Sequence, residues 1–314
     1  MRGVLVPPIR RNGAGRPGIG FCDFPMMTLE PPFDPRYQEG MPFTVATWNV
    51  NSVRKRLDHV ARFARETTID VLCLQETKVV NDLFPAEAMT EMGFSYQAIA
   101  GMKGYNGVAI LSRRPLSDVR VEPWLGRDDC RHVHARVETG SGPVEVHSLY
   151  VPAGGDDPNP EANPKFAYKL DFLDALAPFL AARAASGIPS VLTGDLNVAP
   201  LETDVWSHER LKRVITHTPV ERDKLKDLMT GDDGEGGGWT DALRRFVPAD
   251  QKVFTWWSYR AADWRAADKG RRLDHIWVNP ALAPALSFAA VHDEVRDWPE
   301  PSDHAPVRAV FEIG

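Results

Sequence analysis

The chain has few cysteines, no long apolar run and no excess of positive charge. Its 314 residues include three cysteines, Cys22, Cys73 and Cys130, without a CxxC pair, which predicts a reduced, cytoplasmic protein. No stretch reaches the roughly 18 apolar residues that a membrane helix needs, and prolines interrupt the start where a secretory leader would be apolar. The net charge of −6 excludes a strongly basic protein that wraps nucleic acid, although a local basic face is still possible. We therefore expect a monomer without membrane association.

Two regions differ in composition. Residues 1–40 are rich in proline and glycine and show no helical or strand period, so we interpret them as an irregular, mobile extension. Residues 41–314 contain no linker and are interpreted as a single catalytic domain. Apolar runs in this part predict strands at 43–50, 69–75, 107–112, 132–138, 143–151, 189–197, 272–279 and 305–313.

Helical periods lie between some of these strands, so the fold class is α/β. Apolar spacing predicts one helix over 53–66 with Ser52 as its N-cap. A second helix is expected over 166–181, with an apolar face formed by Phe166, Leu170, Leu173, Ala177 and Leu180. The alternation in 132–138 and 143–151 indicates half-buried, partly antiparallel strands.

Polar side chains with catalytic chemistry follow several of the apolar strands. A rigid scaffold commonly presents functional side chains at such positions. Each cluster alone is more typical of a turn or a strand cap, and it is their repetition within one domain that indicates a site. The clusters are Asn49 and Asn51, Gln75 and Glu76, Asp195 and Asn197, Asp274 and His275, and Asp303 and His304.

These residue types point to metal-assisted hydrolysis of a phosphate ester. The candidate ligands are rich in oxygen, which favours Mg²⁺ or Mn²⁺ over Zn²⁺, and Glu76 fits as the one fixed ligand. An Asp–His pair from different segments fits a base whose imidazole is oriented by a carboxylate. Side-chain amides suit phosphate oxygens and an attacking water.

The same segments resemble a known family. The motifs WNVNSVRKRL, LCLQETK, GVAILSR, GDLNVAP, RLDHI and SDHAPV are similar, in this order, to those of the endonuclease/exonuclease/phosphatase superfamily, above all its exodeoxyribonuclease III-like abasic-site endonucleases. The resemblance implies a four-layered α/β/β/α sandwich, with two central mixed β-sheets flanked by helices. It also implies Mg²⁺, replaceable by Mn²⁺, cleavage of duplex DNA 5′ of abasic sites, and 3′→5′ exonuclease trimming of blocked 3′ ends.

The resemblance also assigns expected roles to individual residues. It implies that Tyr150 contacts the scissile phosphate, that Asp195 activates water or protonates the leaving oxygen, and that Asn197 orients the reacting group. It implies that Asp274 holds the catalytic His304. The metal set that it implies is Asn49, Glu76, Asp195, Asn197, Asp303 and His304. The DNA contacts that we expect are Trp256, beside an abasic pocket, with Arg54 and Lys78.

The sequence departs from the family pattern at two positions, and two rival functions stand beside the DNA-repair interpretation. Asn51 stands where some relatives have an aspartate, which argues against a tight second metal site, and Ala153 removes an amide contact. A phosphatase or phosphodiesterase for inositol phosphates or lipid headgroups is the first rival, and a non-catalytic DNA-binding module is the second.

His132 and His134 share a strand face, but without a visible third soft ligand we expect a packed or solvated edge there. His147 is interpreted as structural.

Overall fold

Two six-stranded mixed sheets packed face to face form the centre of the molecule. In this computed structural model the described residues are 41–230, 238–261 and 263–313, so the expected extension over 1–40 lies outside them. The strands of the first sheet, in the order β13-β14-β1-β2-β4-β3, are β1 (Phe43–Asn49), β2 (Val71–Gln75), β3 (Tyr96–Ala100), β4 (Val108–Ser112), β13 (Leu286–Val291) and β14 (Val307–Phe311).

The second sheet has the order β5-β6-β7-β8-β12-β9. Its strands are β5 (Leu116–Val121), β6 (His132–Val137), β7 (Val144–Tyr150), β8 (Ser190–Asp195), β9 (Thr240–Asp241) and β12 (Asp274–Val278). The pairs β1–β2 and β7–β8 are parallel, and the other pairs are antiparallel.

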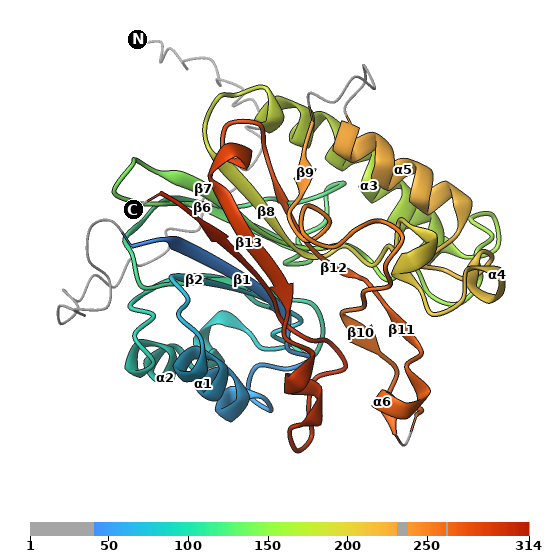
Figure 1. The fold of residues 1–314 in the computed structure, drawn as a ribbon, viewed down its shortest axis with the longest axis horizontal. Helices are drawn as coiled ribbons and strands as arrows, with labels where there is room; N and C mark the ends of the chain where they lie inside the picture. The colour runs from blue at the N-terminus through green and yellow to red at the C-terminus, as the bar shows by residue number, and fades with distance from the viewer. Residues whose placement is uncertain (1–40, 231–237, 262, 314) are drawn as a thin grey trace, which may run out of the picture.

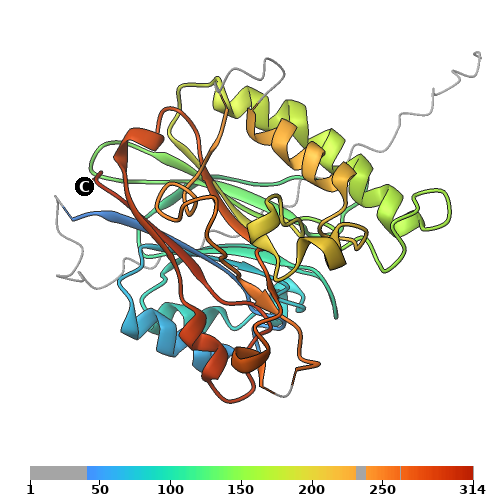
Figure 2. The same ribbon diagram turned by 45° about the vertical axis from the view of Figure 1, so that its right-hand side comes forward.

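Helices cover the outer face of each sheet, as Figures 1 and 2 show. The first sheet is covered by α1 (Leu57–Glu66) and α2 (Ala86–Glu91), and the second by α3 (Pro164–Ala184) and α5 (Pro219–Thr230). Short elements lie near one end of the sandwich: α4 (His208–Leu211), α6 (Trp264–Ala267), β10 (Trp256–Trp257) and β11 (Gly270–Arg271). Single helical turns complete the described chain at Asn81–Leu83, Glu202–Asp204, Ala283–Ala285 and Asp293–Asp297.

Three apolar layers hold these four layers of backbone together. Successive side chains of a strand point to opposite faces, so Val45 packs between the sheets while Ala46 packs under α1. In the second sheet, Val146 packs between the sheets and Leu149 packs under α3. The expected four-layered sandwich with two mixed sheets is therefore confirmed.

The eight predicted strands are the eight interior strands of the two described sheets. The four edge strands, β3, β5, β9 and β13, were not predicted. The expectation that 132–138 and 143–151 are half-buried was wrong, because all of β7 and all but one residue of β6 are buried. The histidines of both strands face α3, where their rings contact Phe179, whereas Ser148 faces the first sheet and bonds to Gln75.

The predicted helix starts need correction. Helix α1 begins at Leu57 after Arg56, and its first turn has no side-chain cap, so Ser52 is not the N-cap. The backbone N–H of Ser52 instead donates to the Glu76 carbonyl at 2.8 Å, which ties this segment to the loop after β2.

The predicted apolar face of α3 also needs correction, because Leu170 and Ala177 are only half-buried. The buried residues of α3 are Phe166, Lys169, Phe172, Leu173, Leu176 and Leu180. None of the helices within the described ranges is both long and apolar enough to cross a bilayer.

A buried ion-pair network fixes the start of β12. The Arg272 side chain is 1% exposed and donates to both carboxylate oxygens of Asp204, at 2.7 and 2.9 Å. It also donates to Asp241 of β9 at 2.5 Å. The network therefore joins three separate segments immediately before Asp274.

We expect Arg272→Met to lower the free energy of unfolding by about 3–5 kcal/mol, because it removes the buried counter-charge of Asp241 and leaves Asp204 with Arg244 alone. The control is Arg136→Met, which removes an exposed pair with Asp118 and should cost no more than about 1 kcal/mol. Urea denaturation at pH 7 measures both variants. Equal losses would mean that the buried network contributes no more than a surface ion pair.

Candidate active site

The polar clusters predicted from sequence meet at one edge of the sandwich. The last residues of the parallel strands β1 and β2 are register partners, Asn49 and Gln75. In the second sheet, Asp195 at the end of β8 is the partner of both Tyr150 and Asp274. Strand register therefore brings five segments that are distant in sequence to the same place.

Glu76 is the centre of the hydrogen bonds that link the two sheets. Its Oε1 accepts from Asn49 Nδ2 at 2.9 Å and from the Tyr150 hydroxyl at 2.9 Å. Lys78 Nζ lies 2.7 Å from Oε2. Burial opposes ionisation, but Lys78 and Asn49 outweigh it and hold the pKa of Glu76 below its usual value. Glu76 and Lys78 both have left-handed backbone, with φ of 51° and 54°, a strain that surrounding contacts must maintain.

His304 lies between two buried carboxylates. Its Nδ1 is 2.8 Å from Asp274 Oδ2, and its Nε2 is 3.7 Å from Asp195 Oδ2. Asp274 is itself held by the Thr255 hydroxyl, which donates to it at 2.6 Å. Burial disfavours the charged imidazole, but Asp274 and Asp195 outweigh it and raise the pKa of His304 to about 10.

The pKa of Asp195 is also raised, which in a carboxyl group favours the neutral form. Burial, helped by Asp274 and Glu76, raises the pKa of Asp195 to about 7 against the stabilising charge of His304. Its Oδ2 accepts from Asn49 Nδ2 at 2.9 Å, and its Oδ1 accepts from the Asn197 backbone N–H at 2.9 Å. A carboxyl group that titrates near neutral pH is suited to proton transfer.

Asn197, by contrast, is held through its own side chain. Its Nδ2 donates to the Val151 carbonyl at 2.9 Å, and its φ is 52°. This fixes the amide beside Asp195. Gln75, from the same cluster as Glu76, is completely buried and donates to Ser148, so it is part of the packing between the sheets.

Asp303 lies beside this group and contacts different partners. Its two oxygens accept from Asn51 Nδ2 and Trp256 Nε1, each at 3.0 Å. Burial opposes ionisation, but His304, Trp256 and Asn51 keep the pKa of Asp303 below its usual value. Lys78 also donates to Asn51 at 2.6 Å, so Asn51 connects Asp303 to the Lys78–Glu76 pair.

The donor set fits a divalent cation. A carboxylate oxygen from each of Glu76 and Asp195 and a ring nitrogen of His304 all lie within 4.8 Å of one another, and the charged His304 ring supplies positive charge there rather than a ligand atom. Four carboxylates gather here, and the cations among them are Lys78 and the His304 imidazolium. Two carboxylate donors and an excess of negative charge suit a hard cation that keeps several water ligands.

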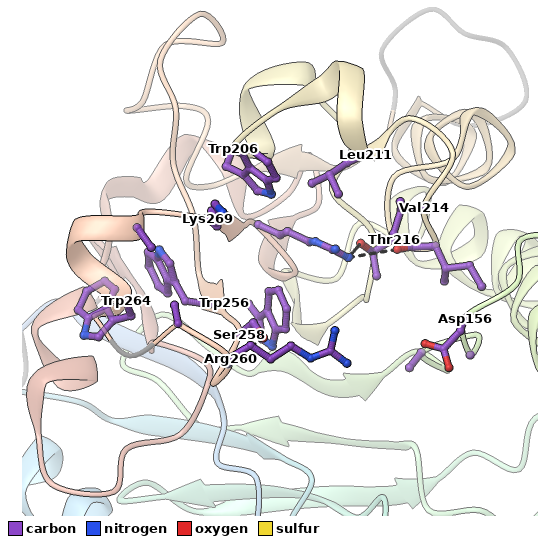
Figure 3. Close-up of a pocket in the computed structure, with 17 residues that line it drawn as sticks. Asp156, Trp206, Leu211, Val214, Thr216, Trp256, Ser258, Arg260, Trp264 and Lys269 are labelled. Atoms are coloured by element: carbon purple, nitrogen blue, oxygen red, sulfur yellow. Dashed lines mark hydrogen bonds between the residues drawn. The ribbon is translucent and has the colours of Figure 1, made fainter.

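A cavity of about 790 Å³ opens next to this group (Figure 3). Trp256 lines it and also binds Asp303, which connects the cavity to the acidic cluster. Trp206, Trp264, Lys269 and Arg271 line it as well. The expected DNA contacts therefore fall in different places, since Trp256 and Lys78 lie at the site while Arg54 is exposed in the turn before α1.

Three residues that line the cavity, Trp206, Trp264 and Lys269, were not singled out by the sequence interpretation. Lys269 Nζ lies 5.3 Å from the centroid of the Trp206 ring, so the pair offers both a cation and an aromatic face. In the sequence, the one feature that could have singled out Trp206 as a site residue is its place shortly after the GDLN motif, in a segment without a strand or helix period. Trp264 and Lys269 lie in a stretch rich in Arg and Lys.

Two mixed sheets with a cluster of candidate metal ligands at one edge are typical of hydrolases of phosphate esters, and comparison with known proteins identifies the family. The Endonuclease/Exonuclease/phosphatase family model matches residues 46–304, so the chain belongs to this family of divalent-metal-dependent enzymes. It is 28% identical to exodeoxyribonuclease III of Haemophilus influenzae over 84% of this chain and 98% of that protein.

Solved structures agree with this assignment. An AP endonuclease from Archaeoglobus fulgidus is 32% identical, with a TM-score of 0.77, and the match covers 86% of this chain and 99% of that one. The 3′ phosphatase NExo from Neisseria, bound to a product DNA hairpin, is 37% identical, with a TM-score of 0.76 and the same coverage.

The charge state of His304 can be tested directly. In metal-free protein with EDTA, we expect the His304 imidazole to keep its proton beyond pH 8 and to lose it near pH 10, because Asp274 and Asp195 stabilise the cation. Asp274→Asn should lower this pKa. Histidine NMR titration measures it, and His275, whose pKa is lowered to about 4 by burial and Arg272, should be neutral in the same spectrum. A His304 midpoint at or below 6.5 would contradict the assignment.

Proposed function

We propose that this chain is a Mg²⁺-dependent DNA repair enzyme that cleaves duplex DNA 5′ of abasic sites and trims blocked 3′ ends by 3′→5′ exonuclease action, with Mn²⁺ able to replace Mg²⁺. The family and the relatives make the chain a phosphoric ester hydrolase of DNA repair. The observation that carries the finer proposal is the cluster of Glu76, Asp195 and His304 beside an aromatic, basic cavity.

Glu76 and Asp195 would hold the cation, with Asn49 supporting both carboxylates. When bound, the cation supplies charge neutralisation on the phosphate oxygens. Glu76 is suited to permanent ligation because its low pKa keeps it ionised at neutral pH. The motifs also assign Asn197 and Asp303 to the metal set. Both lie next to Glu76 and Asp195 and would surround the bound cation without coordinating it directly.

Tyr150, His304 and Asp195 would act on the scissile phosphate and on the attacking water. Burial and the charges of Glu76 and Asp195 raise the pKa of Tyr150 well above its usual value, so its hydroxyl keeps a proton to donate toward the scissile phosphate. Charged His304, oriented by Asp274, would stabilise the negative charge of the phosphate. Asp195 can then accept a proton from the attacking water. This assigns the base to Asp195 and an electrostatic role to His304.

The cavity supports recognition of an abasic nucleotide. Enzymes that act on a single nucleotide of a duplex take it out of the stack into a pocket. Trp256 and Trp206 offer apolar faces for a sugar, while Arg271 and Lys269 supply positive charge for the adjoining phosphates. Lys78 and Arg54 would contact the backbone, which a local basic face permits despite the net charge of −6. We propose that the enzyme acts as a monomer in the cytoplasm.

The substrate class is tested on a duplex with one central abasic analogue. We expect a nick on the 5′ side of the lesion in Mg²⁺, loss of cleavage in EDTA, and slower cleavage as salt rises because phosphate contacts release counterions. An undamaged duplex and a soluble inositol phosphate are the comparison substrates. Rapid hydrolysis of the inositol phosphate without DNA cleavage would overturn the proposal in favour of the rival phosphatase.

The metal assignment is tested by Glu76→Gln, which keeps the shape of the side chain and removes one charge. We expect it to need a much higher Mg²⁺ concentration for half-maximal cleavage, with partial rescue by Mn²⁺, which binds such sites more tightly. Glu138→Gln, at an exposed glutamate, is the matched control. If Glu76→Gln and the control show the same Mg²⁺ dependence, Glu76 only supports the loop.

A further inference from the structure

A second group of ligand-type side chains lies in the second sheet, on the face covered by α3. His134 of β6 and His147 of β7 are cross-strand partners, and their rings stack with centroids 4.8 Å apart. Glu145 precedes His147 by two residues and therefore lies on the same face. Tyr150 of the same strand packs on the opposite face, between the sheets. The group is thus separate from the catalytic edge.

The three side chains converge on a small volume. Glu145 Oε1 lies 3.2 Å from His134 Nδ1 and 3.2 Å from His147 Nε2, and the ligand atoms of all three lie within 4.8 Å of one another. His147 is completely buried, and its Nε2 faces Glu145 Oε1 at 3.2 Å without the geometry of a hydrogen bond. A buried polar nitrogen without a hydrogen bond is costly, and coordination to a cation would satisfy it.

The far side of each imidazole is also held. His134 Nε2 lies 2.9 Å from Glu122 Oε1, and His147 Nδ1 lies 3.0 Å from His132 Nε2. Histidines that bind a metal usually have the other ring nitrogen in such a bond, which fixes the tautomer and the ring orientation. A carboxylate behind His134 and an imidazole behind His147 provide this arrangement.

We propose that His134, Glu145 and His147 bind a divalent transition-metal ion of the zinc class, at a site distinct from the catalytic one. Two imidazole nitrogens and one carboxylate oxygen suit Zn²⁺ and disfavour Mg²⁺, which prefers oxygen ligands. Three protein ligands leave one position for water. The side chains of Glu145 and of Arg183 beside it are 11% and 23% exposed, so the group lies close to the surface.

The metal must compete with Arg183 and with a proton on His134, because Glu122 and Glu145 outweigh burial and raise the pKa of that imidazole. Arg183 of α3 donates through Nε to Glu145 Oε1 at 3.3 Å and stacks over the Phe179 ring. Binding would replace this contact and join β6 and β7 through a single ion beneath α3. Because the three ligands converge only in the folded chain, the ion would stabilise the folded state.

The test uses the full chain stripped of metal, with millimolar Mg²⁺ present to occupy the catalytic site. Zn²⁺ affinity is measured by competition with a chromogenic chelator, and Co²⁺ absorption reports coordination by the histidines. We expect one tight equivalent that raises the melting temperature, is lost in His147→Gln and is retained in Glu76→Gln. Glu122→Gln, which removes only the outer carboxylate, should weaken binding roughly 10- to 100-fold and keeps the proposal testable if His147→Gln does not fold.

His292→Gln is the matched control, since His292 pairs with a lone carboxylate, Glu294, at 2.9 Å. It should leave Zn²⁺ affinity unchanged. Zn²⁺ binding that is lost in Glu76→Gln but kept in both His147→Gln and Glu122→Gln would place the ion at the catalytic edge and overturn the proposal. So would the absence of a tight equivalent in the unaltered chain.

Discussion

The side-chain amide of Asn49 joins the two sheets at the candidate active site. The two hydrogens of Asn49 Nδ2 are shared between Glu76 of the first sheet and Asp195 of the second, each at 2.9 Å. Asn49 is fully buried, so these bonds form where water cannot replace them. Two carboxylates this close would repel each other, and the amide holds them at a spacing that a cation can bridge. An aspartate at this position would supply no hydrogens and would add a third negative charge.

The limits of the sequence interpretation follow from burial. Interior strands such as β1 and β8 are covered on both faces, so they form nearly continuous apolar runs that a sequence reveals. Edge strands such as β5 and β13 alternate exposed and buried positions and are interrupted by irregular pairing, so their pattern resembles that of a loop. The N-cap prediction at Ser52 was wrong for a different reason. The backbone N–H of Ser52 donates to the carbonyl of Glu76, so the residue belongs to a turn beside that loop, and helix α1 begins only after Arg56.

The gathering of these polar side chains at one edge could be predicted because each lies at or near the end of a strand and belongs to an ordered set of motifs. What could not be predicted was which residues meet across strands. Sequence places His132 and His134 on one face without a third ligand, whereas register places His147 and Glu145 of β7 directly beside them. In the same way, Trp206 reaches the cavity from a segment with no period of its own. Contacts of this kind depend on tertiary packing, which local patterns do not encode.

The strand β7 supplies both candidate sites from opposite faces, and their donor chemistry separates the ions they favour. Divalent ions that bind nitrogen more tightly, with zinc above magnesium, are drawn to His134 and His147, while the carboxylates Glu76 and Asp195 favour the hard cation abundant in cells. Zn²⁺ at the catalytic edge would compete for the same carboxylates and engage His304, which the phosphate requires in its charged form. If His134, Glu145 and His147 bind zinc as proposed, the two faces of β7 contribute to two sites of different ligand chemistry, one rich in oxygen donors at the edge of the sandwich and one rich in nitrogen donors under α3.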